Sequence, residues 1–513
     1  MLQAEKTQPT AGTTTTATAT PLPHNLLAPL LTPQDILPIV NSIRPQTDEA
    51  KRSIEDGVES LVQLVRENPQ LVDESAIKTV ESLMALLDQE MSEQVDRILH
   101  HEEFKKVESA WRGLDYLVSN TETDETLKLY VMNVSKENLR RELRQYSGVN
   151  WNQSPFFKKV YRAEFNQFGG EPYGYIVADY QFDHSPIDVE MLRQMAKTAA
   201  AAHCPLITSA SPKLMGFESW RQLPDSAHLR DVFQMKEYTA WRGLREDQDS
   251  RYIYMMLPRF LVRLPWGRRT RPVDRFGYEE TIGNPDDHCW ANAAYAMAVN
   301  INKSFKDFGS CTEICGPEGG GLIKNLPFYT YATADGQTDF TCPTETMIDY
   351  AREAELSKYG FVPVLYRKNH DQACIFGAQS LHKPQEFRGQ DATEANASAQ
   401  LSARLPYLMT VSRFAHYLKA ISYSKVGTFK DRGGLEDYLN TWVLGYVTGD
   451  PQADDQEKAR KPLADAKVVV KADEDNPGYY SANFYLRPHY KFEGLKATMH
   501  LVSKVPAAQA SKS

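Results

Sequence analysis

Hydrophobic positions recur with a helical period near the start of the chain. Between residues 48 and 109 they fall three or four apart in two series, which Pro69 separates. The first series is Ile54, Val58, Leu61 and Val65, and the second is Ile77, Val80, Met84, Leu87, Met91, Val95 and Ile98. This spacing puts the apolar side chains of each series on one face of a helix, with acidic residues behind them. It predicts a helical hairpin that packs on another surface.

From Trp111 onward the pattern changes to alternating strands and helices. Trp111 belongs to a Trp–Leu–Tyr–Leu face that has the character of a buried face. The predicted strands are Leu127–Val134, Tyr173–Tyr180 and Pro205–Ser209, and the predicted helices are Lys136–Tyr146, Asp188–Ala202, Ala227–Leu244, Cys289–Phe308 and Thr344–Lys358. Strands that alternate with helices indicate a layered α/β body.

The last third of the chain begins with a helical pattern and ends with strand patterns. We expect a helix over Ala392–Lys425, a polar loop over Thr448–Lys461 and a strand over Lys467–Lys471. Alternation then continues almost to the end. Tyr490–Phe492, the turn Glu493–Gly494 and the residues from Leu495 to Leu501 read as strand, turn and strand. Pro488 confines its own position to a sheet edge or a bulge.

These patterns predict a mixed α/β fold in four parts. Residues 1–24 are rich in Thr, Ala and Pro and are predicted to be a disordered tail. Residues 25–110 form a linker and the helical hairpin, residues 111–380 the α/β body, and residues 381–513 a C-terminal domain that ends in a β-hairpin.

Composition and charge narrow the class of protein. The chain has 513 residues, 42% of them hydrophobic, and its longest apolar runs, such as Ile253–Leu257, are far too short to span a bilayer. No basic region followed by an apolar core marks a secretory signal. The net charge is −9, and residues 47–110 account for all of it, with 16 acidic and 7 basic residues. A nucleic-acid-binding protein would concentrate the opposite sign. Six dispersed cysteines favour reduced thiols in a cytosol.

Motifs that would carry chemistry are incomplete. The run Gly316–Gly321 lacks the Lys and Ser/Thr that follow the last glycine of a phosphate loop, so it predicts a tight turn. Asp307–Gly309 spells a kinase metal motif without the accompanying loops, and it reads better as a helix that ends at glycine. The adjacent residues His100–Glu103 cannot all face one metal ion, and Cys311 and Cys315 have no second pair. The sequence therefore predicts no catalytic residue, no cofactor and no metal.

Five arginines form the densest basic cluster: Arg263, Arg268, Arg269, Arg271 and Arg275. Nucleic-acid binding is one interpretation, because Trp266 lies among them. The chain outside residues 47–110 is neutral, which favours contacts with carboxylates of a neighbouring subunit. We take Arg268, Arg269 and Arg271 as candidate interface residues.

Several long blocks resemble one known family. They are AWRGLDYLVSNTETDETLKLYVMNVSK (110–136), FGGEPYGYIVADYQFDHSPIDVEML (168–192), AAAAHCPLITSASPKLMGF (199–217), GPEGGGL (316–322), CPTE (342–345), FGAQSLHKP (376–384), RFAHYLKA (413–420) and FYLRPHYKFEGL (484–495). In this order they resemble the large sheath subunit of bacterial type VI secretion systems, the TssC/VipB family. The resemblance implies a structural protein rather than an enzyme, with a contractile-sheath fold like that of phage tail sheaths.

The resemblance also implies partners. Such a subunit pairs with the small sheath subunit, TssB/VipA, and with other copies of itself to form a helical tube around an inner tube of Hcp. Contraction drives the inner tube out, and the AAA+ unfoldase ClpV disassembles the contracted sheath in many systems. The sheath lies in the bacterial cytoplasm, anchored through a baseplate to the inner-membrane complex. Neither nucleic acid nor direct membrane insertion is expected.

Two candidate contact sets follow from this resemblance. Family members interlace strands from chain ends, so we expect subunit contacts at Phe484, Leu486, Tyr490, Phe492, Leu495, Ala497, Met499 and Leu501. The family's unfoldase contact is a short N-terminal helix, and the corresponding segment here is interrupted by prolines. Its apolar residues Ile36, Leu37, Ile39 and Val40 are candidates for that contact. The alternative is that they form a strap on the chain's own helical hairpin.

Two other readings remain open. One is the sheath protein of a related phage-tail-like contractile device, which would assemble without a small partner chain. The other is a cytosolic α/β enzyme, such as a hydrolase or a nucleotide-dependent enzyme, which would bind a ligand saturably and would not elongate.

Overall fold

The computed structural model describes residues 47–67, 76–225, 229–274, 276–328, 330–332, 338–388, 392–424, 432–450, 452–472 and 480–489. The chain divides into two compact units. The smaller consists of residues up to Val95 together with Val273–Tyr278, and the larger of Asp96–Pro272 and the chain from Glu279 onward.

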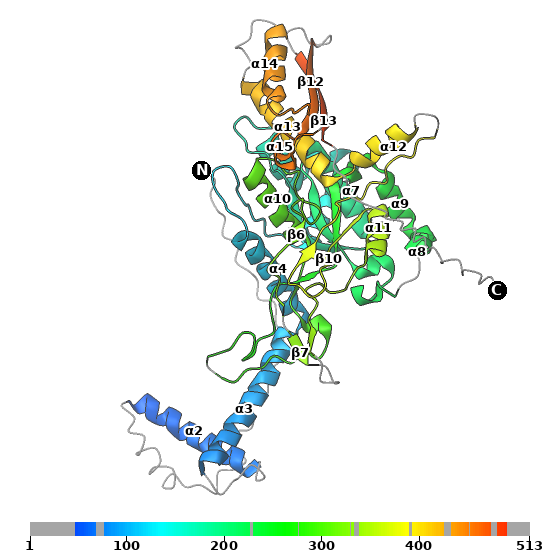
Figure 1. The fold of residues 1–513 in the computed structure, drawn as a ribbon. Helices are drawn as coiled ribbons and strands as arrows, with labels where there is room; N and C mark the ends of the chain where they lie inside the picture. The colour runs from blue at the N-terminus through cyan, green and yellow to red at the C-terminus, as the bar shows by residue number, and fades with distance from the viewer. Residues whose placement is uncertain are drawn as a thin grey trace, which may run out of the picture. The chain divides into compact units, whose positions relative to one another are not determined.

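The helices follow one another along the whole chain (Figure 1). They are α2 (Asp48–Glu67), α3 (Ala76–Leu99), α4 (Glu102–Ser119), α5 (Lys136–Gln145), α6 (Pro155–Phe157), α7 (Pro186–Ala202), α8 (Leu229–Gln234), α9 (Thr239–Glu246), α10 (Ala294–Phe308), α11 (Tyr350–Lys358), α12 (Ala392–Leu401), α13 (Leu405–Ser424), α14 (Arg432–Leu444) and α15 (Asp455–Arg460). The two helices predicted before residue 110 are present as α2 and α3.

The strands are mostly short. They are β1 (Ile176–Phe182), β2 (Leu206–Ala210), β3 (Ile253–Leu257), β4 (Phe260–Leu261), β5 (Trp290–Ala291), β6 (Leu322–Ile323), β7 (Thr330–Ala332), β8 (Thr338–Phe340), β9 (Phe361–Pro363), β10 (Leu365–Tyr366), β11 (Ala373–Cys374), β12 (Leu463–Ala472) and β13 (Tyr480–Pro488).

A parallel sheet in the order β1-β2-β3-β9 forms the centre of the larger unit. Both of its faces are buried. Along β3, Ile253, Met255 and Leu257 belong to one core cluster, and Tyr254 and Met256 to the other. Helix α7 contributes to the first cluster and α10 to the second. A strand that is covered on both faces has a continuous run of apolar residues, as β3 does. The sheet with a helix on each face confirms the predicted layered α/β body.

The C-terminal domain builds its own core on an antiparallel ribbon. Strand β12 pairs with β13, from Leu463 opposite Pro488 to Ala472 opposite Tyr480. Helix α14 packs on β12, as the ribbon in Figure 1 shows. The core of this domain consists of Phe414, Leu418, Leu439, Val443, Leu463, Ala466, Val468 and Val470. Because these residues cluster apart from the two faces of the central sheet, this domain has a separate hydrophobic core.

The predicted strand Leu127–Val134 is wrong. These residues make no sheet ladder, and Leu127 lies in a bend. Leu127, Leu129 and Val134 are half-buried, and the Tyr180 hydroxyl donates a hydrogen bond of 2.7 Å to the carbonyl of Val134. Alternation of apolar and polar residues indicates only that one side of a segment is buried. A β-strand also needs hydrogen bonds between its backbone and a neighbouring strand, which the alternation does not show.

Two long predicted helices are interrupted. Over Ala227–Leu244, α8 ends at Gln234 and α9 starts at Thr239, and Arg242 donates to the freed carbonyls of Phe233 and Met235, both at 2.8 Å. Over Ala392–Lys425, α12 ends at Leu401 and α13 starts at Leu405. Pro406, the second residue of α13, fits this break, because it has no N–H to bond back to the carbonyl of Ser402 and its ring would clash with that carbonyl inside a continuous helix.

Three other predicted boundaries are also wrong. The polar loop Thr448–Lys461 contains α15, which begins after Asp454, whose side chain accepts a hydrogen bond from the Glu457 N–H at 2.6 Å. The helix expected from Cys289 begins at Ala294, and the helix expected from Thr344 begins at Tyr350. In each case a polar or short strand segment precedes the helix.

Candidate assembly surfaces

The described residues hold no group of three or more His, Cys, Asp or Glu side chains that could bind a metal ion. The glycine run is a tight turn, as predicted: φ is 82° at Gly316 and 83° at Gly320. A Cβ on Gly321 would lie 2.3 Å from the carbonyl oxygen of Ile375, so only glycine fits there. Asp307–Gly309 also ends a helix as predicted, with Gly309 at φ 73°.

The outer edge of β12 is covered by side chains from α14. The Asn440 amide donates to the carbonyl of Val468 at 2.8 Å and accepts from its N–H at 2.9 Å. Glu436 accepts from the N–H of Val470 at 2.9 Å. Asn440 thus takes the place of a neighbouring strand, which blocks this edge against pairing with another chain.

The outer edge of β13 is arranged differently. In an antiparallel pair, two residues that lie opposite each other either direct their N–H and C=O groups toward each other or both direct them away from the partner strand. The Val468 groups point away from β13, so those of its partner Phe484 point away from β12. Among the described strands, β13 has no second neighbour. The ribbon therefore has one covered edge and one edge with backbone groups directed outward.

The predicted contact residues of the chain end fall into two groups. Phe484 and Leu486 are half-buried against the core of their own domain, whereas Tyr485 between them is 59% exposed. The others, Tyr490, Phe492, Leu495, Ala497, Met499 and Leu501, lie outside the described residues, as do Ile36, Leu37, Ile39 and Val40. All of them remain predictions.

One arginine of the basic cluster pairs inside its own chain. Arg263 is buried and donates to Glu280 at 2.6 Å and to Glu108 of α4 at 2.7 Å. Arg112 also donates to Glu108, at 2.7 Å. Burial opposes these charges, yet the hydrogen bonds from Arg263 and Arg112 leave the pKa of Glu108 below its usual value, and Glu280 and Glu108 raise the pKa of Arg263. This network fastens α4 to the loop after β4.

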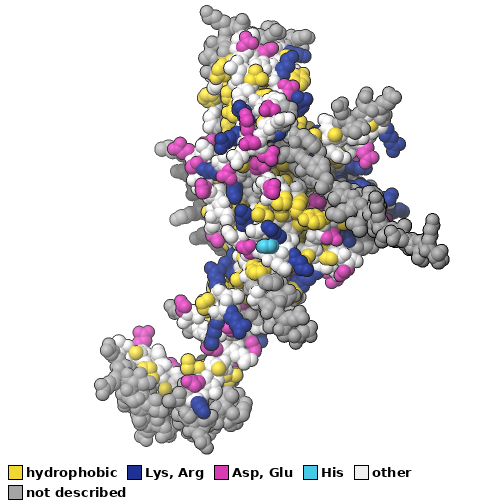
Figure 2. All heavy atoms as spheres, viewed as in Figure 1, with side chains coloured by type: hydrophobic (Ala, Val, Ile, Leu, Met, Phe, Trp, Pro, Cys, Tyr) yellow, Lys and Arg dark blue, Asp and Glu magenta, His cyan; other side chains and the backbone are white. Residues whose placement is uncertain are grey.

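The three arginines named as interface candidates are exposed. The guanidinium of Arg271 lies 4.9 Å from the centre of the Trp266 ring, and the backbone N–H of Arg268 donates to Glu279 at 3.1 Å. Arg268, Arg269 and Arg271 therefore stand on the surface of the larger unit, and their role in subunit contacts stays a prediction. Figure 2 shows acidic and basic side chains interspersed on the face that it draws.

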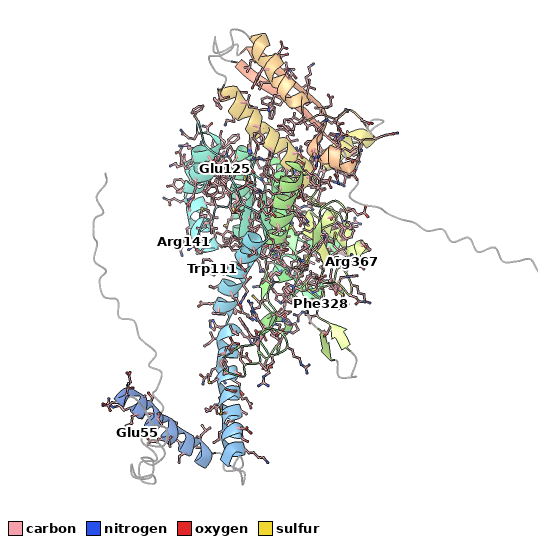
Figure 3. All side chains as sticks on the ribbon, turned by 60° about the vertical axis from the view of Figure 1, so that its left-hand side comes forward. Glu55, Trp111, Glu125, Arg141, Phe328 and Arg367 are labelled. Atoms are coloured by element: carbon pink, nitrogen blue, oxygen red, sulfur yellow. The ribbon has the colours of Figure 1, made fainter. Side chains whose placement is uncertain are left out.

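An exposed apolar stripe on α4 escaped the sequence reasoning. It consists of Phe104, Val107, Trp111 and Val118. Trp111, read from sequence as buried, is 69% exposed (Figure 3), and Gly113 and Leu117 supply the buried side of the helix instead. The signal was present, because the four residues are three, four and seven positions apart. A surface stripe of this kind marks a candidate interaction site.

None of the described helices combines the length and the apolarity that crossing a membrane requires. Three features of the described surface are suited to contacts with other chains: the outward-directed edge of β13, the apolar stripe on α4 and the loop with Arg268, Arg269 and Arg271. These are the features of a subunit of a larger assembly.

The comparisons with known proteins agree with this class. A family model described as "EvpB/VC_A0108, tail sheath N-terminal domain" (VipB) matches residues 81–382, and a second, "EvpB/VC_A0108, tail sheath gpW/gp25-like domain", matches residues 394–505. The type VI secretion system sheath protein TssC1 of Pseudomonas aeruginosa is 50% identical over 474 residues, which cover 92% of this chain and 95% of that protein.

The chain belongs to the TssC/VipB family, the large sheath subunits of type VI secretion systems. It is a structural subunit of a contractile sheath, as its sequence blocks predicted. A chain of the cryo-EM structure of the anti-feeding prophage baseplate is similar to 76% of this chain over 86% of its own length, with 10% identity and a TM-score of 0.35.

Proposed function

We propose that the chain co-assembles with a small sheath subunit of the TssB/VipA type into a helical tube around an Hcp inner tube, and that contraction of this tube propels the inner tube. The observation that supports this most is the identity of 50% to TssC1 over 92% of the chain, across both sheath domains. In this proposal the chain transforms no small molecule, and its work comes from repacking between copies.

The open edge of β13 supports a strand-exchange interface. An outward-directed edge templates a strand from another chain, and the covered edge of β12 leaves one direction for that addition. A contact of this head-to-tail kind that does not close produces an open helical filament. The strand predicted from the sequence after His489, with Met499 and Leu501, is the candidate donor. It would keep subunits linked while rigid bodies rotate.

The remaining partners and the location extend this proposal. The tube would stand in the bacterial cytoplasm, attached through a baseplate to the inner-membrane complex. ClpV would recognise the segment with Ile36, Leu37, Ile39 and Val40. A titration of a peptide of residues 24–45 against purified ClpV checks the last point, and a lack of saturable binding would favour the strap interpretation.

Electron microscopy of the chain co-expressed with its small partner tests the proposal. We expect long tubes from the pair, and none from either protein alone. Tubes formed by this chain alone would indicate the phage-tail-like alternative. A discrete particle that never elongates beside its partner, and that turns over a ligand, would indicate an enzyme and refute the sheath assembly.

Replacement of Met499 or Leu501 by proline tests the strand donation. Proline removes a ladder hydrogen bond, so we expect the folded body without tubes. Circular dichroism checks folding and electron microscopy checks assembly. Normal tubes from either variant would refute the donor strand.

A further inference from the structure

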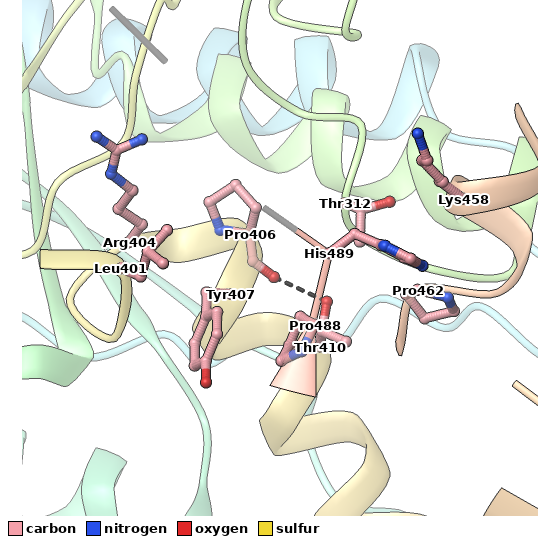
Figure 4. Close-up of a pocket in the computed structure, with 10 residues that line it drawn as sticks. All are labelled: Thr312, Leu401, Arg404, Pro406, Tyr407, Thr410, Lys458, Pro462, Pro488 and His489. Carbon is pink, nitrogen blue, oxygen red and sulfur yellow. Dashed lines mark hydrogen bonds between the residues drawn. The ribbon is translucent and has the colours of Figure 1, made fainter. Parts of the chain in front are cut away.

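A cavity at the start of α13 is too small for an organic ligand. Its volume is about 30 Å³, and one water needs about 10–15 Å³ of such space, so it has room for about two waters. Figure 4 shows it beside Pro406, whose carbonyl accepts a hydrogen bond from the Thr410 hydroxyl at 2.8 Å. A contact with a large partner therefore has to lie on the surface.

Residues 128–134 are a surface segment whose backbone lacks a partner strand. Their sequence, KLYVMNV, contains the aromatic and β-branched residues that favour strands. In the structure they belong to neither a helix nor a strand, and none of their N–H groups donates a hydrogen bond to another described residue. The sequence thus has strand character, while the described chain supplies no strand to pair with it.

Side-chain contacts hold this segment beside β1 and the chain that precedes it. At one end, Lys128 pairs with Glu171 at 2.5 Å, and at the other, the Tyr180 hydroxyl donates to the carbonyl of Val134 at 2.7 Å. Because both ends are held in the single chain, less conformational freedom is lost when another chain pairs with the segment.

Three consecutive apolar side chains of the segment are exposed. Tyr130 is 64% exposed, Val131 68% and Met132 43%. Successive side chains of a strand point to opposite faces, so a strand formed here would offer apolar surface on both faces. Unpaired backbone groups next to exposed apolar side chains are the features to which another chain adds a strand.

The charges on the two sides of the segment have opposite sign. Residues 122–125 hold three acids and no base, and residues 136–144 hold four bases and two acids. Glu122 and Glu125 are exposed before the segment, and Arg144 of α5 is exposed after it. A strand with a basic residue at its first end and an acidic residue at its second end complements these charges.

The strands that a second copy could offer do not have this pattern. The strand β13, whose edge is unpaired, contains Arg487 and no acid. Residues 495–501, which the sequence predicts as a strand, contain Lys496 and His500 and no acid. In the assembly proposed above, these two strands also pair with each other between copies. A strand for residues 128–134 is therefore expected from a different polypeptide.

We propose that residues 128–134 receive a β-strand of the small sheath subunit, an alternately apolar strand with a basic end beside Glu122 and Glu125 and an acidic end beside α5. This inference rests on the proposed function and adds to it the place where the two subunits pair. The backbone of residues 128–134 forms the ladder, and the strand covers Tyr130, Val131 and Met132. The strand that the sequence predicts here forms in the assembly and not in the single chain.

Amide hydrogen exchange tests the pairing. The free chain is compared with tubes assembled from the chain and its purified small subunit. The N–H groups of residues 128–134 should exchange rapidly in the free chain. In tubes every second one should exchange at least about tenfold more slowly, because a strand directs alternate N–H groups toward its partner.

Two results of this experiment separate the inference from the proposed function. Unchanged exchange of residues 128–134 in intact tubes would overturn the inference and leave the proposed function standing. If the unsubstituted chain forms no tubes with the small subunit, the proposed function fails first and the inference falls with it.

A photo-crosslinker identifies the chain that covers the segment. The photoreactive amino acid p-benzoylphenylalanine replaces Tyr130, whose exposed ring leaves room for it. After irradiation of tubes, we expect mass spectrometry to find crosslinks from this position to the small subunit. Crosslinks only to other copies of this chain, or none in intact tubes, would overturn the inference.

Substitution of an apolar residue gives an independent readout. Val131→Ser should raise the concentration of small subunit needed for half-maximal binding about tenfold, because the complex no longer buries the valine side chain. Val149→Ser, at a side chain 92% exposed, is the matched control and should have no effect. The unfolding midpoints of both variants should match that of the parent. Equal binding by the two variants would contradict the proposal.

A charge reversal tests the orientation of the added strand. Glu122→Lys should raise the same concentration about fivefold, because it places a base beside the basic end of the strand. Glu218→Lys, at another exposed glutamate, makes the same change in net charge and should have no effect. Binding that is unchanged or stronger in Glu122→Lys would refute the assigned orientation.

Discussion

The central sheet and the C-terminal ribbon use strands in opposite ways. Each strand of the sheet is short and lies between two helical layers, with β3 buried along its whole length. The ribbon has longer strands, of which only one face meets a core, and Tyr485 on its other face is exposed. The sheet directs its apolar side chains into a closed interior. Among the described residues, the ribbon instead has one solvent-exposed face and an edge, that of β13, without a neighbouring strand.

The two edges of the ribbon sharpen this difference. A free edge invites pairing with any extended chain, and proteins usually cover it. Here Asn440 and Glu436 cover the edge of β12, while β13 keeps backbone groups directed outward. Among the described strands, side chains therefore block the addition of a further strand on the β12 side of the ribbon and not on the β13 side.

The largest effect on stability is expected in the sheet. Phe361 of β9 is fully buried, with its ring centre 6.3 Å from that of Trp241 and 6.0 Å from that of Phe233. Phe361→Ala should lower the free energy of unfolding by about 3–5 kcal/mol, because it leaves a cavity in a packed layer. Urea denaturation measures this. Phe168→Ala, at a side chain 81% exposed, is the control and should change it by less than about 0.5 kcal/mol.

Signals close together in sequence predicted β1 and β2, two of the four strands of the central sheet, and the helices α5 and α7. Ser135 and Ser185 cap α5 and α7 by accepting hydrogen bonds from backbone N–H groups three residues later, and such caps are visible in a sequence. The apolar runs of β1 and β2 were equally clear. Local sequence thus set the positions of these elements.

Long-range pairing could not be predicted in the same way. Arg263 and Glu108 are 155 residues apart, so an arginine assigned to an external surface cluster is instead paired internally. The covering of β12 by Asn440 depends on α14, a helix that the sequence reasoning did not identify. Trp111 was predicted to be buried because large aromatic side chains usually are. Which side of a helix is covered depends instead on the elements that pack against it. These features follow from the tertiary arrangement.

An intermediate effect is expected at the covered edge. Asn440→Leu leaves the N–H and carbonyl of Val468 without their side-chain partner and should lower the free energy of unfolding by about 2 kcal/mol. It should also permit pairing on the wrong side of the ribbon, measured as concentration-dependent light scattering. Thr441→Ala, one residue along α14 and exposed, should do neither. A soluble, fully stable Asn440→Leu variant would show that α14 covers this edge without the amide.

The smallest effect on stability and a large effect on assembly should coincide at Tyr485. This side chain faces away from the core of its domain, so Tyr485→Ala should change the free energy of unfolding by less than about 0.5 kcal/mol. Exposed tyrosines often anchor subunit contacts, because they bury a large ring at little entropic cost. Tube yield with the small partner, counted by electron microscopy, should therefore fall although the chain remains folded. Lys467→Ala, at the residue directly opposite on β12, is the matched control and should assemble normally. Equal tube yields from the two variants would mean that the ribbon contributes its edge to assembly but not its exposed face.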